Sequence, residues 1–412
     1  MPPRLKVLMS AYACEPHRGS EPEVGWQWAL QMARFHDVTV VTRANNQPPI
    51  ESALSSYPDP KPEFIYYDLP NWLLGLKRRG LPVSVYYALW QGSVRRHLAS
   101  RLTNFDLIHH VTFNSFRQPG FWWSCGKPVV LGPLGGGQIC PWRFLPTFGR
   151  RLLPEAARSL SVMGSAVLPN LYASFSAATV ILVANRDTAR RIRAASRSKI
   201  QSLLETGVAR ELILSAESRA EDGTVRMIWV SRLEKIKGGS LALRAFALAF
   251  AREKKLRLSI VGSGPERARL RRLAVTLGID SAITWHGAVP KTDIPKLLRT
   301  HDVFLFTSLR DTSGNVLLEA MAAGLPALTL LHHGAAEIAT DETALRIPPT
   351  RPAETAQAIA SGILRLANAP DLRQRMSRAA TARMLAEFSW ERKGAQMSAI
   401  YEQAVRQFQA RA

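Results

Sequence analysis

Short apolar runs alternate along the chain with longer amphipathic segments, which is the pattern of a parallel β-sheet covered by helices on its faces. Turn residues or charges bound several of these runs, which therefore predict buried strands. The expected strands are Lys6–Ala13, Asp37–Thr42, Phe64–Asp68, Asp106–Thr112, Lys127–Gly132 and Thr179–Ala184 in the first half, and Arg226–Val230, Arg257–Gly262, Ile283–Gly287 and Val303–Thr307 in the second. This alternation favours a doubly wound α/β fold.

The length of 412 residues favours two domains of ordinary size. The expected boundary lies at Ser202–Val208, after which the composition turns polar over Glu217–Asp222 and the next strand begins. We therefore expect one domain over residues 1–205 and a second over residues 206–390.

One strand–loop–helix unit, Phe304–Pro326, concentrates residues that can carry chemistry. Its polar loop contains Asp311, and its helix, expected from about Gly314 to Ala323, carries Glu319. Open α/β sheets bind ligands at the carboxyl ends of their strands, and the free N–H groups of a new helix favour an anion. Glu319 could also serve only the helix dipole, and Asp311 could serve only the turn.

A second pattern follows the expected strand Arg226–Val230, where Arg232 stands five positions before Lys237 and two glycines come next. An Arg fork and a Lys point charge that converge on a helix N-terminus suit the oxygens of a diphosphate. The pattern therefore predicts a diphosphate clamp, although both cations could also be solvated surface residues.

Glycines follow several expected strands, where bare backbone can approach a ligand closely. Gly136 is the middle one of three consecutive glycines, in a loop that can cradle a phosphate or lie against a sugar. The other candidates are Gly19, Gly262, Gly264 and Gly287. Turn geometry or packing would also explain a glycine at each of these positions.

The sequence EAMAAGLP at Glu319–Pro326, with an acid eight positions earlier at Asp311, resembles the signature of glycosyltransferase family 4. That family has the GT-B architecture, in which two doubly wound Rossmann-like domains face each other across a cleft. The chain departs from the usual pattern in two places. The first acid is Asp where Glu is usual, and Ser313-Gly314 replaces an aromatic-Gly pair.

The resemblance implies a role for each candidate residue. Asp311 would contact the donor sugar and Glu319 would hold the ribose of the nucleotide. Ser313, Gly314 and Asn315 would contact the donor beside these acids, and Arg232 and Lys237 would bind the donor phosphates. The backbone around Gly262, Gly264 and Gly287 would contact the base. Gly334, before Glu337, would lie near the sugar or phosphate, and the Gly19 loop would approach the donor phosphate or the acceptor. A terminal helix at 391–412 resembles the family's last helix, which completes the first domain.

The expected strand Asp106–Thr112 carries His109 and His110 near its end. Adjacent strand residues face opposite sides of a sheet, so the two side chains cannot share a role. Members of the family often have a histidine here beside the donor sugar, in a His-x-His spacing from which this adjacent pair departs. His110 is nearer the strand end and is the favoured candidate, with His109 as the alternative.

The activity implied by the resemblance is retaining transfer of a sugar from a nucleotide diphosphate sugar to a hydroxyl acceptor. We find no pair of acids that must flank the sugar, so we expect the leaving diphosphate to take the proton of the acceptor. We expect no cofactor and no metal, because cations already clamp the phosphates. Two alternatives stay open. One is another GT-B enzyme, a phosphorylase or a nucleotide-sugar epimerase, and the other is a non-enzymatic protein that binds anionic surfaces.

The net charge of +22 would suit nucleic acid or an anionic membrane as a partner. No helix-turn-helix, zinc-finger or RNA-recognition signature accompanies the charge, so we expect no nucleic-acid partner. The segment Leu69–Pro154 has Asp106 as its only acid. Its basic residues are Lys77, Arg78, Arg79, Arg95, Arg96, Arg101, Arg117, Lys127, Arg143, Arg150 and Arg151.

Within this segment, Asn71–Leu102 interleaves the cations with Trp and Leu, and a second aromatic run covers Trp142–Phe148. Such segments bind membrane interfaces, although burial of the apolar face in the protein core is the commoner arrangement. We expect a cytoplasmic protein held peripherally on the inner face of the membrane, with a lipid-linked acceptor of polysaccharide or lipopolysaccharide assembly. The three cysteines form no disulfide or zinc pattern, which favours a reducing compartment.

Overall fold

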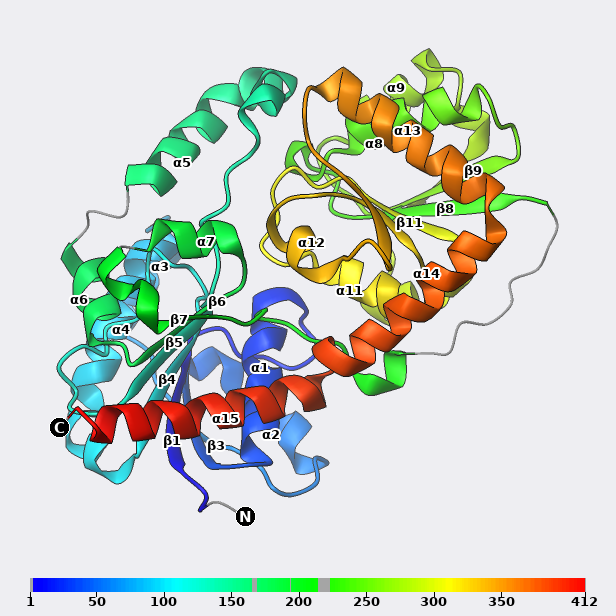
Figure 1. Ribbon diagram of the computed structural model, residues 1–412. Coiled ribbons are helices and arrows are strands. Elements are labelled where there is room, and N and C mark those ends of the chain that lie inside the picture. Colours follow the sequence, from blue (N-terminus) through cyan, green and yellow to red (C-terminus); the bar gives the residue numbers. More distant parts are fainter. Residues whose placement is uncertain (1–2, 165–168, 193, 214–222, 412) are drawn as a thin grey trace. The chain divides into compact units, whose positions relative to one another are not determined.

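The computed structural model describes residues 3–164, 169–192, 194–213 and 223–411, and the predicted polar stretch at 217–222 lies outside them. The chain divides into two compact α/β units (Figure 1). The first unit comprises Met1–Gly137, Val162–Glu205 and Trp390–Ala412, and the second comprises Gln138–Ser161 and Thr206–Ser389. The sequence boundaries assigned Gln138–Ser161 to the first domain. Its side chains instead pack with the second unit.

The first unit is built on a parallel sheet that has seven strands among the described residues, in the order β3-β2-β1-β4-β5-β6-β7. The strands are β1 (Lys6–Ala11), β2 (Asp37–Thr42), β3 (Glu63–Tyr66), β4 (Leu107–Thr112), β5 (Val129–Leu134), β6 (Val180–Val183) and β7 (Ile200–Ser202). The helices are α1 (Ser20–Ala33), α2 (Gln47–Ser55), α3 (Asn71–Arg78), α4 (Val83–His97), α6 (Pro169–Ala177), α7 (Arg186–Arg191) and α15 (Trp390–Gln409), and α5 (Leu152–Gly164) passes from the second unit into the first.

The second unit has a parallel sheet of six described strands, in the order β10-β9-β8-β11-β12-β13. The strands are β8 (Val225–Val230), β9 (Leu256–Val261), β10 (Ile283–Gly287), β11 (Val303–Phe306), β12 (Ala327–Leu330) and β13 (Ala344–Ile347). The helices are α8 (Gly239–Phe250), α9 (Arg267–Thr276), α10 (Ile294–Arg299), α11 (Asn315–Ala322), α12 (His333–Ile338), α13 (Pro352–Asn368) and α14 (Pro370–Arg383), and a short π-helix covers Met384–Phe388.

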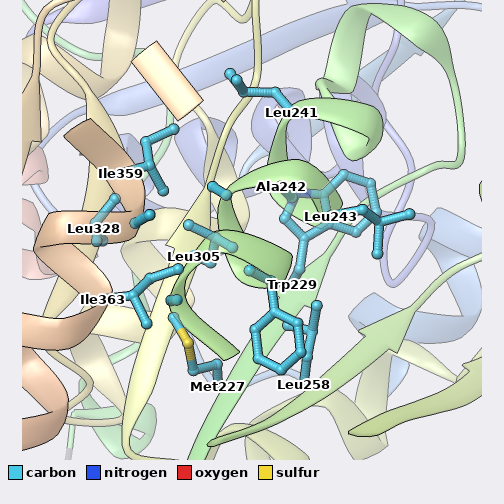
Figure 2. Close-up of a cluster of buried hydrophobic side chains, with 14 of the residues drawn as sticks. Met227, Trp229, Leu241, Ala242, Leu243, Leu258, Leu305, Leu328, Ile359 and Ile363 are labelled. Atoms are coloured by element: carbon cyan, nitrogen blue, oxygen red, sulfur yellow. The ribbon is translucent and has the colours of Figure 1, made fainter. Parts of the chain in front are cut away.

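The central strands are largely buried because helices cover both faces of each sheet (Figure 1). β4, β5, β11 and β12 are buried at every position. Figure 2 shows the core of the second unit, where Met227, Leu305 and Leu328 from neighbouring strands lie together with Ile359 and Ile363 of α13. Each fully buried aliphatic side chain contributes about 1.5–3 kcal/mol to folding.

In each sheet the strand order reverses beside the first strand, between β1 and β4 in the first unit and between β8 and β11 in the second. Met227 and Ile228 of β8 pair with Val303 and Phe304 of β11. Because the two strands are parallel neighbours, the loops that leave their carboxyl ends emerge side by side. Such reversal points are where doubly wound sheets bind ligands.

Several elements differ from the sequence predictions, which did not include β7, β12 or β13. Helix α1 begins at Ser20 and contains Gly25. A Cβ at Gly25 would lie 2.2 Å from the carbonyl oxygen of Ala13, so the glycine lets the helix pack directly on the chain leaving β1. A further strand, β7, follows β6, which the sequence took as the last strand of its half. β7 has three partly exposed residues and therefore no continuous apolar run.

Candidate functional site

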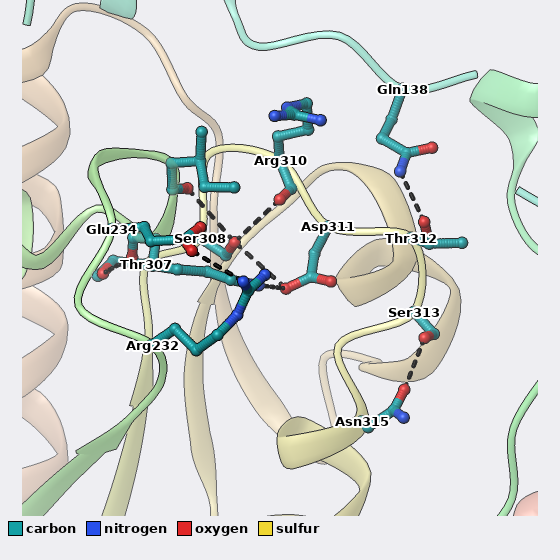
Figure 3. Close-up of polar contacts among 12 residues, drawn as sticks. Gln138, Arg232, Glu234, Thr307, Ser308, Arg310, Asp311, Thr312, Ser313 and Asn315 are labelled. Atoms are coloured by element: carbon teal, nitrogen blue, oxygen red, sulfur yellow. Dashed lines mark hydrogen bonds and ion pairs between the residues drawn. The ribbon is translucent and has the colours of Figure 1, made fainter. Parts of the chain in front are cut away.

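The loops after β8 and β11 are joined by an ion pair between two of the predicted site residues. Lys237 ends a 3-10 turn (Lys235–Lys237) that precedes α8, and its Nζ lies 2.5 Å from Oδ2 of Asp311. The Lys237 side chain is 14% exposed and that of Asp311 is 22% exposed. Ser308 Oγ also donates to Asp311 Oδ2 at 3.3 Å (Figure 3). The sheet order explains this meeting, because the two residues follow neighbouring strands.

Further hydrogen bonds hold the same two loops together. Thr307 Oγ1 donates to the backbone carbonyls that follow β8, at 3.2 Å from Lys237 O and 3.1 Å from Gly238 O. Trp229 Nε1 donates to Thr307 Oγ1 at 3.0 Å. Gly238 has φ 70°, and a Cβ there would lie 2.1 Å from Thr307 O. The Lys237–Asp311 pair is therefore set on a tightly packed backbone.

Arg232, the other cation of the predicted clamp, has a different environment. Its Nη1 lies 2.8 Å from Oε1 of Glu234, two residues further along the same loop (Figure 3). The Arg232 side chain is 72% exposed. Each predicted cation thus has its own carboxylate partner, and Arg232 keeps most of its guanidinium open to solvent.

Glu319 lies on α11, the helix that follows the Asp311 loop. Among the described residues, no hydrogen bond or ion pair reaches its half-buried carboxylate. Burial raises the pKa of Glu319, and the charge of Lys291 opposes that shift. At the start of the helix, Ser313 Oγ donates to Asn315 Oδ1 at 2.8 Å, and Gly314 has a left-handed backbone with φ 76°.

The candidate glycines of the second unit allow close backbone approach rather than an open cradle. A Cβ at Gly262 would lie 1.9 Å from Ser231 O, and one at Gly264 would lie 2.6 Å from Leu233 O. Both glycines thus pack the loop after β9 onto the Arg232 loop. Gly334 lies inside α12, where a Cβ would be 2.2 Å from Thr312 O.

Gly287 differs from these three, since its φ is 72° and no atom would lie within 4 Å of a Cβ there. Its carbonyl accepts the N–H of Gly262 at 2.7 Å.

The segment Gln138–Ser161 is fastened to the residues that flank Asp311, a feature the sequence did not indicate. Gln138 Nε2 donates to Thr312 Oγ1 at 2.7 Å (Figure 3). Arg310 Nε lies 3.1 Å from Oε1 of the buried Glu155 on α5. An acid at the start of α5 and an Arg in the loop were visible in the sequence, but their pairing depends on the tertiary fold.

His109 and His110 of β4 are both completely buried in the first unit and face opposite sides of the sheet, as alternation requires. His109 is hydrogen bonded on both ring nitrogens, through Nδ1 to the Tyr401 hydroxyl and through Nε2 to Gly132 O, each at 2.6 Å. Burial lowers the pKa of His109 to about 4. This environment is that of a structural histidine joining β4 to α15.

His110 lies on the opposite face, where its Nε2 is 3.0 Å from the Tyr87 hydroxyl and 3.3 Å from Phe113 O. Burial lowers the pKa of His110 to about 3, and the neighbouring His109 lowers it further. A Cβ at Gly120 would lie 2.7 Å from Nδ1, so the ring packs directly on that backbone. Its role beside a sugar stays a prediction.

Glu21, which the sequence analysis did not select, is the second residue of α1, two positions after Gly19. Its Oε1 accepts the backbone N–H of Asn114 at 2.6 Å. Burial and the charge of Glu205 raise the pKa of Glu21 to about 7, and the hydrogen bond from Asn114 opposes the shift. Gly19 has φ 71° and caps the helix, and Gly136 has φ 87° after β5. The acid-containing loop sequence RGSEPE was the available signal for Glu21.

A cavity of about 260 Å³ lies around the start of α8, and Glu234, Lys235 and Gly238 of the loop after β8 line it. Phe144, Ser240, Arg244, Arg269 and Leu309 contribute to its walls, and none of the predicted donor-binding side chains does. Separately, the described residues contain no group of three or more His, Cys, Asp or Glu side chains placed to hold a metal ion.

Comparisons with known proteins show which proteins share this sequence pattern and this fold. Residues 213–383 match the family described as glycosyl transferases, group 1. The crystal structure of a glycosyltransferase from Rickettsia africae superposes with a TM-score of 0.65 at 14% identity, covering 98% of this chain and 99% of that one. Anabaena HepE, solved with UDP and glucose, gives a TM-score of 0.61 at 15% identity over 97% of this chain and 100% of that one.

The chain therefore has the GT-B glycosyltransferase fold, as its sequence predicted. The match of residues 213–383 to glycosyl transferases, group 1, is compatible with the resemblance to family 4. The putative colanic acid biosynthesis glycosyltransferase WcaL of Salmonella typhimurium is 33% identical over 120 residues, which cover 28% of this chain and 30% of that protein. The matched segments span less than half the length of the first curated relatives.

Proposed function

We propose that this protein transfers a sugar from a nucleotide diphosphate sugar to a hydroxyl acceptor, with retention of the anomeric configuration. The observation that carries the proposal is the Lys237–Asp311 pair at the reversal point of the second sheet, followed along the chain by the carboxylate of Glu319, which has no hydrogen-bond or ion-pair partner among the described residues. A fixed cation suits a diphosphate, and an unpartnered carboxylate suits the two hydroxyl donors of a ribose. The family match and the GT-B fold support the same function.

In the proposed reaction, the bond between the anomeric carbon and the diphosphate oxygen breaks while a bond to the acceptor oxygen forms on the same face of the sugar. The acceptor proton passes to the leaving diphosphate. Lys237 stabilises the negative charge that develops on that diphosphate, and Arg232 adds hydrogen bonds from its fork. Asp311 orients Lys237 and accepts from a sugar hydroxyl, and Glu319 holds the ribose.

The proposal assigns the neutralisation of the diphosphate to these cations, so it includes no divalent metal and no bound cofactor. Turnover measured before and after exhaustive treatment with EDTA tests this part. A loss of turnover that Mg²⁺ or Mn²⁺ restores would contradict it.

The function is tested by a thermal-shift screen of nucleoside diphosphates and nucleotide sugars, because a ligand that binds the folded state raises its stability by mass action. We expect at least one nucleotide sugar to raise the melting temperature, and its diphosphate to do so in wild type but less in Lys237→Met. Product analysis then separates transfer from phosphorolysis, which needs inorganic phosphate, and from epimerisation, which needs no acceptor. No stabilisation by any nucleotide would contradict the proposal.

We further propose that the protein binds the cytoplasmic face of a membrane through α3 and α4 and takes a lipid-linked acceptor (Figure 1). No residue of α3 is buried, and Trp72 is 66% exposed. The other large apolar side chains exposed on these two helices and their connection are Leu76, Val83, Val85 and Leu89. Arg78, Arg79 and Arg96 are exposed beside them. Exposed Trp and Leu with adjacent Arg match an interfacial element.

Other parts of the predicted membrane surface have different surroundings. Tyr87 and Trp90 of α4 are completely buried, and Phe144 and Phe148 belong to the core of the second unit. These residues were wrongly counted as interfacial aromatics, because their periodicity is equally that of a helix packed on a core. Within the part of the chain that the structure describes, no helix is both long and apolar enough to span a bilayer.

Vesicle sedimentation tests the membrane proposal. Vesicles with anionic lipid should bind the protein and release it in high salt, since each basic residue near the surface contributes about 1 kcal/mol. Reversal of Arg78, Arg79 and Arg96 to Glu should abolish binding. Reversal of Arg267, Arg271 and Arg272, which are exposed on α9, makes the same change in net charge and should leave most of the binding intact. Equal loss in both triple variants would contradict the assigned surface.

A further inference from the structure

The carboxyl ends of β1, β2 and β3 bring together a second cluster of charged residues, in the first unit. Tyr12 directly follows β1, Arg43 directly follows β2, and Asp68 follows β3 by two residues. Lys77 reaches the cluster from α3 and donates from Nζ to the Tyr12 hydroxyl at 3.1 Å. No motif in the sequence marked these four residues as a group, since they come from four separate segments.

The two cations stack on aromatic rings, which fixes their positions. The guanidinium carbon of Arg43 lies 5.1 Å from the centre of the Tyr12 ring. Lys77 Nζ lies 4.5 Å from the centre of the Tyr86 ring and 5.7 Å from that of Tyr12. Aromatic faces attract cations and hold them without consuming their hydrogen-bond donors.

The cluster contains two positive charges and one carboxylate. Asp68 Oδ1 lies 3.5 Å from Arg43 Nε and accepts the Tyr86 hydroxyl at 3.1 Å. Among the described residues, no hydrogen bond engages Nη1 or Nη2 of Arg43, and Tyr12 is the only hydrogen-bond partner of Lys77 Nζ. Burial lowers the pKa of Lys77, and the charge of Arg43 lowers it further. The fold therefore holds two positive charges close together while some of their N–H donors have no hydrogen-bond acceptor among the described residues.

We propose that Arg43 and Lys77 bind a phosphate group of the acceptor. The fork of Arg43 and the ammonium of Lys77 supply the donors that a phosphate needs, and Tyr12 forms the apolar floor. The site lies at the carboxyl ends of β1, β2 and β3, on the side of the sheet where doubly wound units bind ligands. This inference rests on the proposed function, and it adds that the hydroxyl acceptor is a phosphate ester or a diphosphate rather than a neutral sugar.

The same helix joins this site to the exposed apolar surface. Leu76, which is exposed, directly precedes Lys77, and Trp72 lies five residues, about 1.4 helical turns, before Lys77. An acceptor whose phosphate carries an apolar chain could therefore contact Lys77 and the outer side of α3 together. A soluble sugar phosphate would use only the charged cluster.

The first test measures binding of inorganic phosphate by ³¹P line broadening at constant ionic strength. All variants are made in a Lys237→Met background, so that binding at the proposed donor site does not contribute. We expect Arg43→Gln and Lys77→Met each to weaken phosphate binding at least tenfold. Asp68→Asn should strengthen it severalfold, because this change frees Arg43 while the amide still accepts from Tyr86. Unchanged affinity in all three variants would overturn the proposal.

The Asp68→Asn result separates binding from a structural role, since a variant that only disturbed the fold would not gain affinity. The nucleotide screen tests the proposed function separately, because it measures donor binding to the second unit and does not depend on Arg43. A second experiment separates the two sources of phosphate. Turnover with a soluble sugar phosphate is compared with turnover on a polyprenyl-diphosphate-linked sugar in vesicles, in wild type and in Trp72→Ser.

If the acceptor is lipid-linked, Trp72→Ser should lower turnover only in vesicles, while Arg43→Gln lowers it in both assays. If the source is soluble, Trp72→Ser should have no effect in either assay, and the phosphate site stands. Full turnover of Arg43→Gln and Lys77→Met with a phosphorylated acceptor would overturn the site.

Discussion

Lys237 and Asp311 form a partly buried ion pair that closes the gap between the loops after β8 and β11, with Nζ 2.5 Å from Oδ2. Seventy-four positions separate the two residues in sequence. They meet because their strands are parallel neighbours at the point where the sheet order reverses. In the proposed reaction, the ion pair orients the Lys237 ammonium before the donor phosphate binds, and Asp311 can still accept a hydrogen bond from a sugar hydroxyl.

Lys237→Ala is expected to lower turnover at least tenfold, about 1.4 kcal/mol of transition-state stabilisation, and also to destabilise the second unit. The loss of stability follows because Asp311, with a side chain only 22% exposed, would lose its cation. Steady-state kinetics and urea denaturation measure the two effects. Arg272→Ala, an exposed cation on α9, is the control and should change neither quantity. Normal turnover in Lys237→Ala would remove the residue from the site.

Arg232→Ala should separate the two effects, because its side chain is 72% exposed and its ion pair with Glu234 is of the kind that contributes little to stability. We expect at least a tenfold loss of turnover from the missing charge-assisted contacts, with the free energy of unfolding changed by less than about 0.5 kcal/mol. Glu234→Gln, which removes the competing carboxylate, should keep turnover at or above the wild-type level. Near-normal turnover in Arg232→Ala would contradict a role in binding the donor.

The comparison of these residues shows how far sequence alone reaches. Asp311, Glu319, Arg232 and Lys237 follow apolar strands in recognisable local patterns, so their position at the sheet edge was predictable. The ion pair of Lys237 was not, since the sequence leaves the order of β8 and β11 open. The pairing of Arg232 with Glu234 was also missed, because two cations in one loop suggested convergence on a ligand.

In the first unit, the sequence indicated less of the side-chain arrangement. The alternation rule correctly separated His109 from His110, but only tertiary packing shows that Tyr401, near the end of the chain, occupies one of them. The Arg43–Lys77 cluster comes from segments with no shared motif. Where function depends on side chains that four distant segments contribute, local pattern carries little information.

Glu319→Gln is expected to weaken binding of the nucleoside diphosphate while stabilising the free protein at neutral pH. Binding weakens because the ribose hydroxyls lose an ionised acceptor. Stability rises because burial raises the folded-state pKa of Glu319 above its unfolded value. Such a group favours folding below the unfolded pKa, and this contribution is lost as the pH rises through the folded pKa, so the neutral amide removes a penalty. Calorimetry and thermal denaturation measure the two effects.

In wild type, affinity for the nucleotide should also fall on acidification, beginning above the ordinary range of a glutamate. The titration of the diphosphate affects both proteins equally, so the ratio of wild-type to Glu319→Gln affinity isolates the carboxylate. An unchanged affinity in the variant, or a ratio independent of pH, would place Glu319 outside the site.

Acid should destabilise the first unit through His109 and His110. Their folded-state pKa values, lowered to about 4 and about 3, lie below the unfolded value of 6.5. Between these limits the unfolded chain binds more protons, so stability falls as the pH falls from about 6.5 to about 4. His109→Gln should reduce the slope of the unfolding free energy against pH by up to about 1.4 kcal/mol per pH unit. Urea denaturation at pH 7, 6 and 5 measures this. The exposed His286→Gln is the control, and an equal slope in wild type and His109→Gln would contradict the assignment.

Gly238→Ala and Gly278→Ala form a matched pair that tests whether close packing of the β8 and β11 loops supports the site. The two glycines have almost the same positive φ, 70° and 68°, so we expect the conformational cost of alanine to be about 1 kcal/mol at each. At Gly278 no atom lies within 4 Å of the new Cβ, whereas at Gly238 it would lie 2.1 Å from Thr307 O. Gly238→Ala must therefore push the two loops apart.

We expect Gly278→Ala to cost about 1 kcal/mol of unfolding free energy and to leave turnover unchanged. Gly238→Ala should cost at least about 2 kcal/mol more, a size typical of overpacking. It should also lower turnover at least tenfold, because Lys237 directly precedes the displaced residue and would leave Asp311. Urea denaturation and steady-state kinetics on the two variants decide the matter. If both alanines cost the same and both variants keep their turnover, the backbone contact with Thr307 does not position Lys237.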